Sequence, residues 1–133
     1  MKLTNILSSL TVMLFIMLLL QACKEEKKIL GPKITVSKPL QDEEVQINKS
    51  FVVKAEFYDK DGLQNISLQA YIKQWKTDSL FFTSVQNAQG VNTFRIDTTL
   101  TVTANTHWAY LVFEGKDFDG ASSRQIIRVR VTP

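Results

Sequence analysis

Apolar and polar residues alternate with a period of two through almost all of the chain after Gly31. This pattern is typical of β-strands that bury one face, and no helical period of useful length is present. The alternation predicts strands near Ile34, at Phe51–Tyr58, at Ile66–Trp75, near Phe81, at Phe94–Val102, at Trp108–Glu114 and at Ile126–Val131. A further short alternation covers Val45 and Ile47, and Pro39 ends the first strand.

Seven or eight short strands in about 100 residues predict an all-β fold, an Ig-like antiparallel β-sandwich. Turn residues separate the strands at intervals of roughly 8–12 residues, as that architecture requires. The strand near Phe81 takes either the C′ or the D position, which the alternation leaves open. No disulfide is available to staple the domain, because Cys23 is the only cysteine. The core must therefore stand on packing alone, for which a domain of this size is large enough.

A separate segment precedes the strands. From Leu10 to Leu20 the chain is apolar except for Thr11, and Lys24 and Glu25 follow soon after. Such a run suits the core of a signal peptide and is shorter than the roughly 20 residues that span a bilayer. The sequence therefore predicts a leader that is removed.

Leu20, Ala22 and Cys23 resemble the lipobox of bacterial lipoproteins, although Gln21 departs from the small residue more usual at its place. The resemblance implies that Cys23 is lipidated on sulfur, becomes the first residue of the mature chain and is acylated on its amine. Two or more acyl chains anchor a protein stably to a membrane, whereas one anchors it marginally. The alternative is an ordinary signal peptide followed by a free thiol.

Residues 23–32 form a charged tether that begins with Cys23-Lys24-Glu25-Glu26. Charge of this density is expected to remain solvated. The segment also resembles the acidic export signal that follows the lipidated Cys in surface lipoproteins of the Bacteroidota. We therefore expect a signal peptide at 1–22, the tether at 23–32 and the sandwich at 33–133. The expected location is the outer membrane, facing outward, with the periplasmic face as the alternative.

The strand spacing and a repeated turn resemble the disulfide-free Ig-like modules of bacterial surface lipoproteins, close to cadherin and fibronectin type III domains. That turn is Asp59-Lys60-Asp61-Gly62 after one strand and Asp117-Phe118-Asp119-Gly120 after another. Both loops fall at the same end of an Ig-like sandwich. Four aspartates that converge there would offer Ca²⁺ the oxygen ligands that it prefers, as Asp-x-Asp pairs do in cadherin-like modules. The competing interpretation is turn chemistry, in which Gly takes a positive φ and Asp caps its own backbone.

A candidate contact face lies on the outward side of three strands that neighbour one another in this fold. Its residues are Tyr71, Trp108, Tyr110, Arg128 and Arg130, with Lys73 and Val112 on the same parity. Aromatic residues and arginine are enriched in contact surfaces, and flat rings also suit a sugar ligand. Alternatively, Trp108 and Tyr110 pack under a loop, or stack on the two arginines within the domain.

The sequence gives little indication of a catalytic site. His107 is the only histidine, and no nucleophile elbow, zinc cluster or phosphate loop is present. The net charge of the whole chain is +3, of which Lys2 is lost with the leader, so no polyanionic partner such as nucleic acid is expected. We expect a non-catalytic module that binds a protein partner in the outer membrane. The alternative is a module that binds a glycan or calcium, and no other cofactor is expected.

Overall fold

The computed structural model describes residues 30–73 and 78–133, so Cys23 and the leader lie outside the described residues. These residues form eight β-strands and no helix, and hence no helix that could cross a membrane. The strands are β1 (Lys33–Lys38), β2 (Glu44–Gln46), β3 (Ser50–Tyr58), β4 (Leu63–Lys73), β5 (Asp78–Asn87), β6 (Thr93–Thr101), β7 (Trp108–Asp117) and β8 (Ser122–Thr132).

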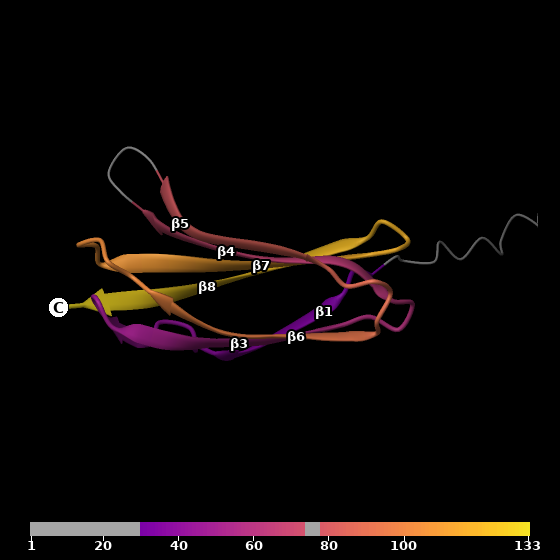
Figure 1. The fold of residues 1–133 in the computed structure, drawn as a ribbon, viewed down its shortest axis with the longest axis horizontal. Coiled ribbons are helices and arrows are strands. Elements are labelled where there is room, and N and C mark those ends of the chain that lie inside the picture. Colours follow the sequence, from indigo (N-terminus) through magenta and orange to yellow (C-terminus); the bar gives the residue numbers. More distant parts are fainter. Residues whose placement is uncertain (1–29, 74–77) are drawn as a thin grey trace, which may run out of the picture.

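Two sheets face each other across the core (Figure 1). One has three strands in the order β1-β3-β6, and the other has five in the order β2-β8-β7-β4-β5. Every strand pair is antiparallel except β2 with β8, which is parallel. Consecutive strands such as β3 and β4 lie in different sheets, as they do in Ig-like sandwiches. The prediction of an Ig-like antiparallel sandwich is confirmed.

The apolar parity of each predicted strand supplies the core. Phe57 on β3 and Phe113 on β7 are both fully buried, and they come from opposite sheets. The remaining buried apolar residues include Val53, Ala55, Ile66, Leu68, Ala70, Ile72, Leu100, Ala109, Leu111, Ile127 and Val129. Burial of each large apolar side chain stabilises the fold by about 1.5–3 kcal/mol, so packing holds the two sheets together without a disulfide bond.

Three features of the strands differ from the sequence prediction or go beyond it. The strand expected near Phe81 is longer than predicted, since β5 has ten residues. It pairs with β4 and therefore takes the C′ position. The last strand starts at Ser122 rather than at Ile126, because Ser122 to Gln125 pair with β7 although they carry little apolar signal. Trp75, the predicted end of β4, lies outside the described residues.

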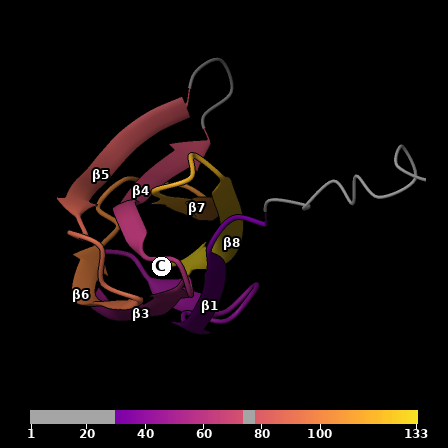
Figure 2. The ribbon, with the colours of Figure 1, turned by 90° about the vertical axis from the view of Figure 1, so that its right-hand side faces the viewer.

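The start of β1 and the β3–β4, β5–β6 and β7–β8 turns gather at one end of the sandwich, and the C-terminus lies at the other (Figure 1). Pro32 is buried at this end, and a Cβ atom on Gly31 would lie 2.5 Å from the carbonyl carbon of Ser122. The chain before β1 is therefore wedged against the start of β8. A view along the strands shows β5 and β6 at one open side of the sandwich and β1 beside β8 at the other (Figure 2).

Candidate functional site

The predicted contact face lies on the outer side of the five-stranded sheet, and its five residues are neighbours there. Tyr71 on β4 is directly opposite Tyr110 on β7, and Tyr110 is opposite Arg128 on β8. Trp108 is opposite Arg130 in the next row. Since opposite residues on antiparallel strands share a face, the register places all five side chains together.

The two arginines stack on Trp108. The Cζ atom of Arg128 lies 4.2 Å from the ring centroid, and that of Arg130 lies 5.6 Å from it. Both distances are within the range of a cation–π interaction. The alternative in which the aromatic residue stacks on the arginines within the domain is therefore the arrangement found. Trp108 is only partly buried, so the stack orients the ring without covering it.

Two acidic residues that the sequence did not single out hold these arginines. Arg128 Nε lies 2.6 Å from Asp42 Oδ1, and Arg130 Nη1 lies 3.2 Å from Glu44 Oε1. The pKa of the Asp42 carboxyl is lowered, chiefly by the hydrogen bond that it accepts from Arg128, and the same bond raises the pKa of the Arg128 guanidinium. The segment around β2 thus orders the arginine side of the face.

Exposed apolar side chains extend this face toward both edges. Leu80 and Val85 on β5 are 53% and 70% exposed, and Ile126 on β8 is 49% exposed. Val112, which was expected to point outward, does so and is nevertheless fully buried, because Gln69 and Ile126 flank it from the two neighbouring strands. We use the name aromatic face for Tyr71, Trp108, Tyr110, Arg128 and Arg130 together with Leu80, Val85 and Ile126.

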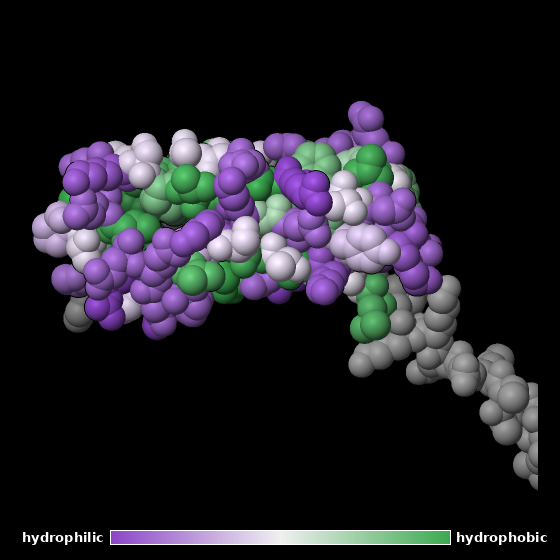
Figure 3. Space-filling model, turned by 90° about the horizontal axis from the view of Figure 1, so that it is seen from below, coloured by the Kyte–Doolittle hydropathy of each residue, from purple (hydrophilic) through white to green (hydrophobic). Residues whose placement is uncertain are grey.

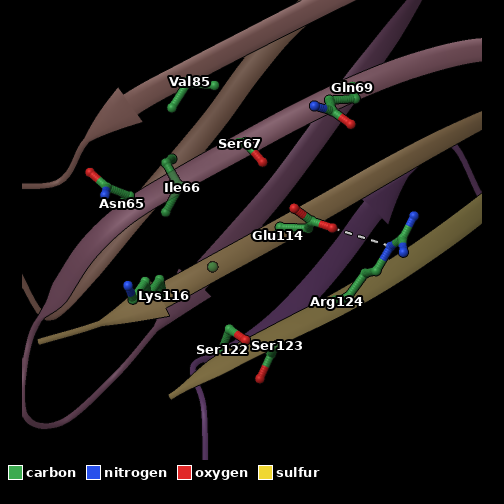
Figure 4. A pocket seen from close by; sticks show the side chains of 11 residues that line it. Asn65, Ile66, Ser67, Gln69, Val85, Glu114, Lys116, Ser122, Ser123 and Arg124 are labelled. Carbon is green, nitrogen blue, oxygen red and sulfur yellow. Dashed lines mark ion pairs between the residues drawn. The ribbon is translucent and has the colours of Figure 1, made fainter. Parts of the chain in front are cut away.

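A depression of about 450 Å³ adjoins the aromatic face (Figure 4). Its lining residues are Asn65, Ile66, Ser67, Gln69, Val85, Glu114, Gly115, Lys116, Ser122, Ser123 and Arg124. Arg124 Nε lies 3.3 Å from Glu114 Oε1, and Arg124 Nη2 donates a hydrogen bond of 3.4 Å to the Tyr71 hydroxyl. Arg124 therefore links the depression to the aromatic face. Amides, hydroxyls and one ion pair lie on a lining whose accessible surface is mostly apolar.

The four aspartates of the repeated turn do not come together as a metal site. No group of three or more His, Cys, Asp or Glu side chains in residues 30–73 and 78–133 is placed to hold a metal ion. Asp59 Oδ1 instead accepts a hydrogen bond of 2.8 Å from the backbone N–H of Asp61. Asp117 Oδ1 accepts one of 2.8 Å from the N–H of Ala121. The arrangement supports turn chemistry and gives the calcium hypothesis no geometric basis.

The glycines complete the same turn twice. The N–H of Gly62 donates to the carbonyl of Asp59, and that of Gly120 donates to the carbonyl of Asp117, both at 3.4 Å. Their φ angles are 99° and 87°, which side chains with a Cβ rarely adopt. At Gly62 there is a second constraint, because a Cβ atom would lie 2.9 Å from the carbonyl oxygen of Gly90. The β3–β4 turn is therefore packed against the β5–β6 connection.

His107 lies apart from the aromatic face, near the C-terminal end of the sandwich. Its side chain is exposed, and its backbone carbonyl accepts a hydrogen bond of 2.9 Å from Val131. The depression beside it, of about 360 Å³, has no acidic residue in its lining, which consists of Ile47, Asn105, Thr106, Val131, Thr132 and Pro133 besides His107 itself. This lining supplies no Asp or Glu side chain to orient His107 as a general base.

Comparison with known proteins leaves the function open. No family model matches the chain, and no curated protein matches it. Among solved structures, murine CRIg is similar over 77% of this chain and 98% of its own, with 11% sequence identity and a TM-score of 0.44. A similarity this weak does not establish the fold, so the fold assignment rests on the strand order and register.

Proposed function

We propose that the chain is a lipid-anchored, non-catalytic module of the cell envelope that binds a protein partner through the aromatic face. The observation that carries this proposal is the ordered cluster of Tyr71, Trp108 and Tyr110 beside two ion-paired arginines on one exposed sheet. Aromatic residues and arginine dominate the energetics of protein contacts. Because the cluster is already oriented, its own side chains lose little conformational entropy when a partner binds.

The outer face of the other sheet provides the contrast. It carries two cross-strand ion pairs, with Lys54 Nζ 3.1 Å from Asp97 Oδ2 and Arg95 Nε 2.8 Å from Glu56 Oε2. Hydrophilic side chains occupy much of this side of the molecule, with scattered apolar ones between them (Figure 3). Tyr58 is an exposed aromatic residue there, but no arginine in residues 30–73 and 78–133 is found stacked on its ring. Both outer faces carry ion pairs, and the aromatic face differs in the neighbouring rings of Tyr71, Trp108 and Tyr110 and in the arginines stacked on Trp108. This difference supports a contact role for the aromatic face.

The anchor and its location belong to the same proposal. The lipobox-like residues ending at Cys23 and the acidic segment after it support attachment to the outer membrane, with the module facing outward. The tether of residues 23–32 reaches at most about 35 Å when extended, so the aromatic face would meet partners close to the membrane.

A second candidate function is glycan binding, and the polar side chains in the depression beside Tyr71 favour it. Asn65, Ser67 and Gln69 present amides and a hydroxyl there, and Arg124 connects this lining to Tyr71. A sugar needs polar groups for its hydroxyls and an aromatic ring for its apolar face. Both occur within this one surface.

Photo-crosslinking in cells that produce the full chain tests the proposal. A photoreactive residue replaces Tyr71, and the second-site variants Tyr110→Ala and Tyr58→Ala are compared. We expect a discrete crosslinked protein whose yield falls with Tyr110→Ala and is unchanged with Tyr58→Ala, the matched change on the opposite sheet. Equal losses from both variants, or no discrete product from a folded and exposed chain, would contradict a protein partner. Retention of the chain on immobilised oligosaccharides, lost in Gln69→Ala, would then establish the glycan function instead.

A further inference from the structure

Apolar side chains are exposed at the end of the sandwich where the chain enters β1 (Figure 1). Phe118 in the β7–β8 turn is 56% exposed, and Val91 in the β5–β6 connection is 44% exposed. Leu30, directly before the segment wedged against β8, is 70% exposed. The described connections at the other end, residues 47–49 and 102–107, have no large apolar side chain of comparable exposure. We use the name apolar tip for Leu30, Val91 and Phe118.

Contacts between neighbouring turns hold the apolar tip in place. The N–H of Leu63, at the start of β4, donates a hydrogen bond of 2.9 Å to the carbonyl of Val91. The ring of Phe118 lies against Gly90, where a Cβ atom would be 3.3 Å from Cε2 of the ring. Phe118 is therefore supported by the β5–β6 connection on one side and open to solvent on the other. A rigid apolar surface of this kind gains free energy when a partner removes it from water.

The charged side chains around the apolar tip do not form a cationic surface. Lys60 Nζ lies 3.2 Å from Asp61 Oδ2, and exposed Lys116 is followed three positions later by exposed Asp119. The same turns also contain the two buried aspartates whose carboxylates accept backbone N–H groups. This end thus has no excess of positive charge, so a partner would be bound through apolar contact rather than through anionic groups.

The place where the chain enters the domain selects a lipid surface as the partner. Leu30 is seven positions after Cys23, so the two are separated by at most about 25 Å of extended chain. An anchor at Cys23 therefore keeps this end of the sandwich next to the bilayer. Because the contact is then intramolecular in effect, even a small apolar surface is enough to occupy it. Phe and Leu are among the side chains that enter the boundary between lipid headgroups and acyl chains.

We propose that the apolar tip inserts into the headgroup boundary of the bilayer that holds the anchor. This inference rests on the lipid anchor of the proposed function and adds a second contact with the same membrane. The insertion is shallow, so Asp61 and Asp119 remain in the hydrated headgroup layer. The strands then stand away from the membrane surface, and the aromatic face on the side of the sandwich stays accessible to a partner.

Fluorescence quenching in the lipidated full chain tests the insertion. A nitrobenzoxadiazole fluorophore is attached to Asp119→Cys in the β7–β8 turn or to Asn105→Cys at the other end, both at exposed residues. The chain is reconstituted into phosphatidylcholine vesicles in which part of the lipid carries a nitroxide on the acyl chain. We expect quenching of the fluorophore at Asp119→Cys only, unchanged in high salt, which screens charge but not apolar contact. Equal quenching at both sites, or quenching that requires anionic lipid and disappears in salt, would overturn the proposal.

Two valines of equal exposure provide a matched comparison for the quenching at Asp119→Cys. Val91→Ser changes the apolar tip, and Val52→Ser changes a residue near the start of β3, both at 44% exposure. The ratio of inserted to free domain is expected to fall about tenfold with Phe118→Ser, by a smaller factor with Val91→Ser, and not at all with Val52→Ser. Equal effects of the two valine variants would contradict insertion of the tip.

Mass spectrometry of the same preparation separates failure of the insertion from failure of the anchor. Lipid on Cys23 together with an unquenched fluorophore at Asp119→Cys would overturn the insertion and leave the anchor intact. A chain without lipid on Cys23 would overturn the anchor, and this inference with it.

Discussion

Replacement of Asp117 by Ala or by Asn separates the role of this residue in the turn from a role in metal binding. The side chain is 2% exposed, and its Oδ1 atom accepts a hydrogen bond of 2.8 Å from the N–H of Ala121. Asp117→Ala leaves that N–H without its charged acceptor, a loss worth about 1.5–3 kcal/mol. For a domain of about 100 residues, a loss near 2 kcal/mol lowers the midpoint of thermal unfolding by about 8–16 °C.

Thermal unfolding of the purified protein, followed by far-ultraviolet circular dichroism with EDTA or with added calcium, measures this loss. Asp117→Asn keeps an oxygen that can accept from Ala121 and is expected to lose less than half as much as Asp117→Ala. Asp119→Ala changes the exposed aspartate of the same turn and is expected to stay within about 0.5 kcal/mol of the parent.

Two results would refute the turn interpretation. One is an Asp117→Asn variant as unstable as Asp117→Ala, since the hydrogen bond alone does not require a charge. The other is a calcium-dependent rise of the midpoint that both Asp117 variants abolish. Either result would return the aspartates to consideration as ligands of a cation.

Three further predictions concern the core, the loops and the arginine side of the aromatic face. Phe113→Ala is expected to lower the free energy of unfolding by about 3–5 kcal/mol in urea titrations, because the ring is fully buried, and a loss below 1 kcal/mol would contradict the assigned core. Gly62→Ala should lower the free energy of unfolding by at least 1 kcal/mol more than Gly120→Ala, as followed by differential scanning fluorimetry. Both glycines have positive φ, but only at Gly62 would a Cβ atom lie against a backbone carbonyl oxygen. Equal losses of stability would argue against that contact. Since Arg128 lowers the pKa of Asp42, the pair stabilises the fold above the ordinary carboxyl pKa, and this contribution disappears as the pH falls through the lowered pKa. Asp42→Asn should remove that part of the dependence of unfolding free energy on acid pH. An unchanged dependence in this variant would show that the pair does not contribute to stability.

The alternation of apolar residues predicted the sandwich because a strand with one buried face has an apolar residue at every second position. It placed Phe57 and Phe113 in the core and Tyr110 on the outer face, where the register puts them. It did not predict the length of β5 or its pairing with β4. The alternation is weak there because β5 has apolar residues on both faces and a register shift opposite Ala70 and Tyr71, which puts Leu80, Phe81 and Phe82 in one run.

The aromatic face was predicted in part, for a comparable reason. Parity identified Trp108 and Arg128 as neighbours across two strands, but Asp42 lies 86 residues from Arg128 in sequence and belongs to a connection without a repeating pattern. The four aspartates show the opposite case. Their residue types and shared loop end suggested a cation site, whereas the carboxylates of Asp59 and Asp117 are directed by the N–H groups of Asp61 and Ala121. Composition indicates which chemistry is available, and backbone geometry decides whether it is assembled.

The wedge of Gly31 and Pro32 against the start of β8 determines how the domain would respond to force. Under the proposed anchoring, tension on the tether enters at the first residue of β1 and is directed along that strand. The hydrogen bonds between β1 and β3 are then loaded together in shear, rather than opened one after another as in a hairpin that is unzipped. Buried Pro32 must also be extracted before β1 can slide. A module built in this way should yield at high force and remain folded while a partner pulls on it.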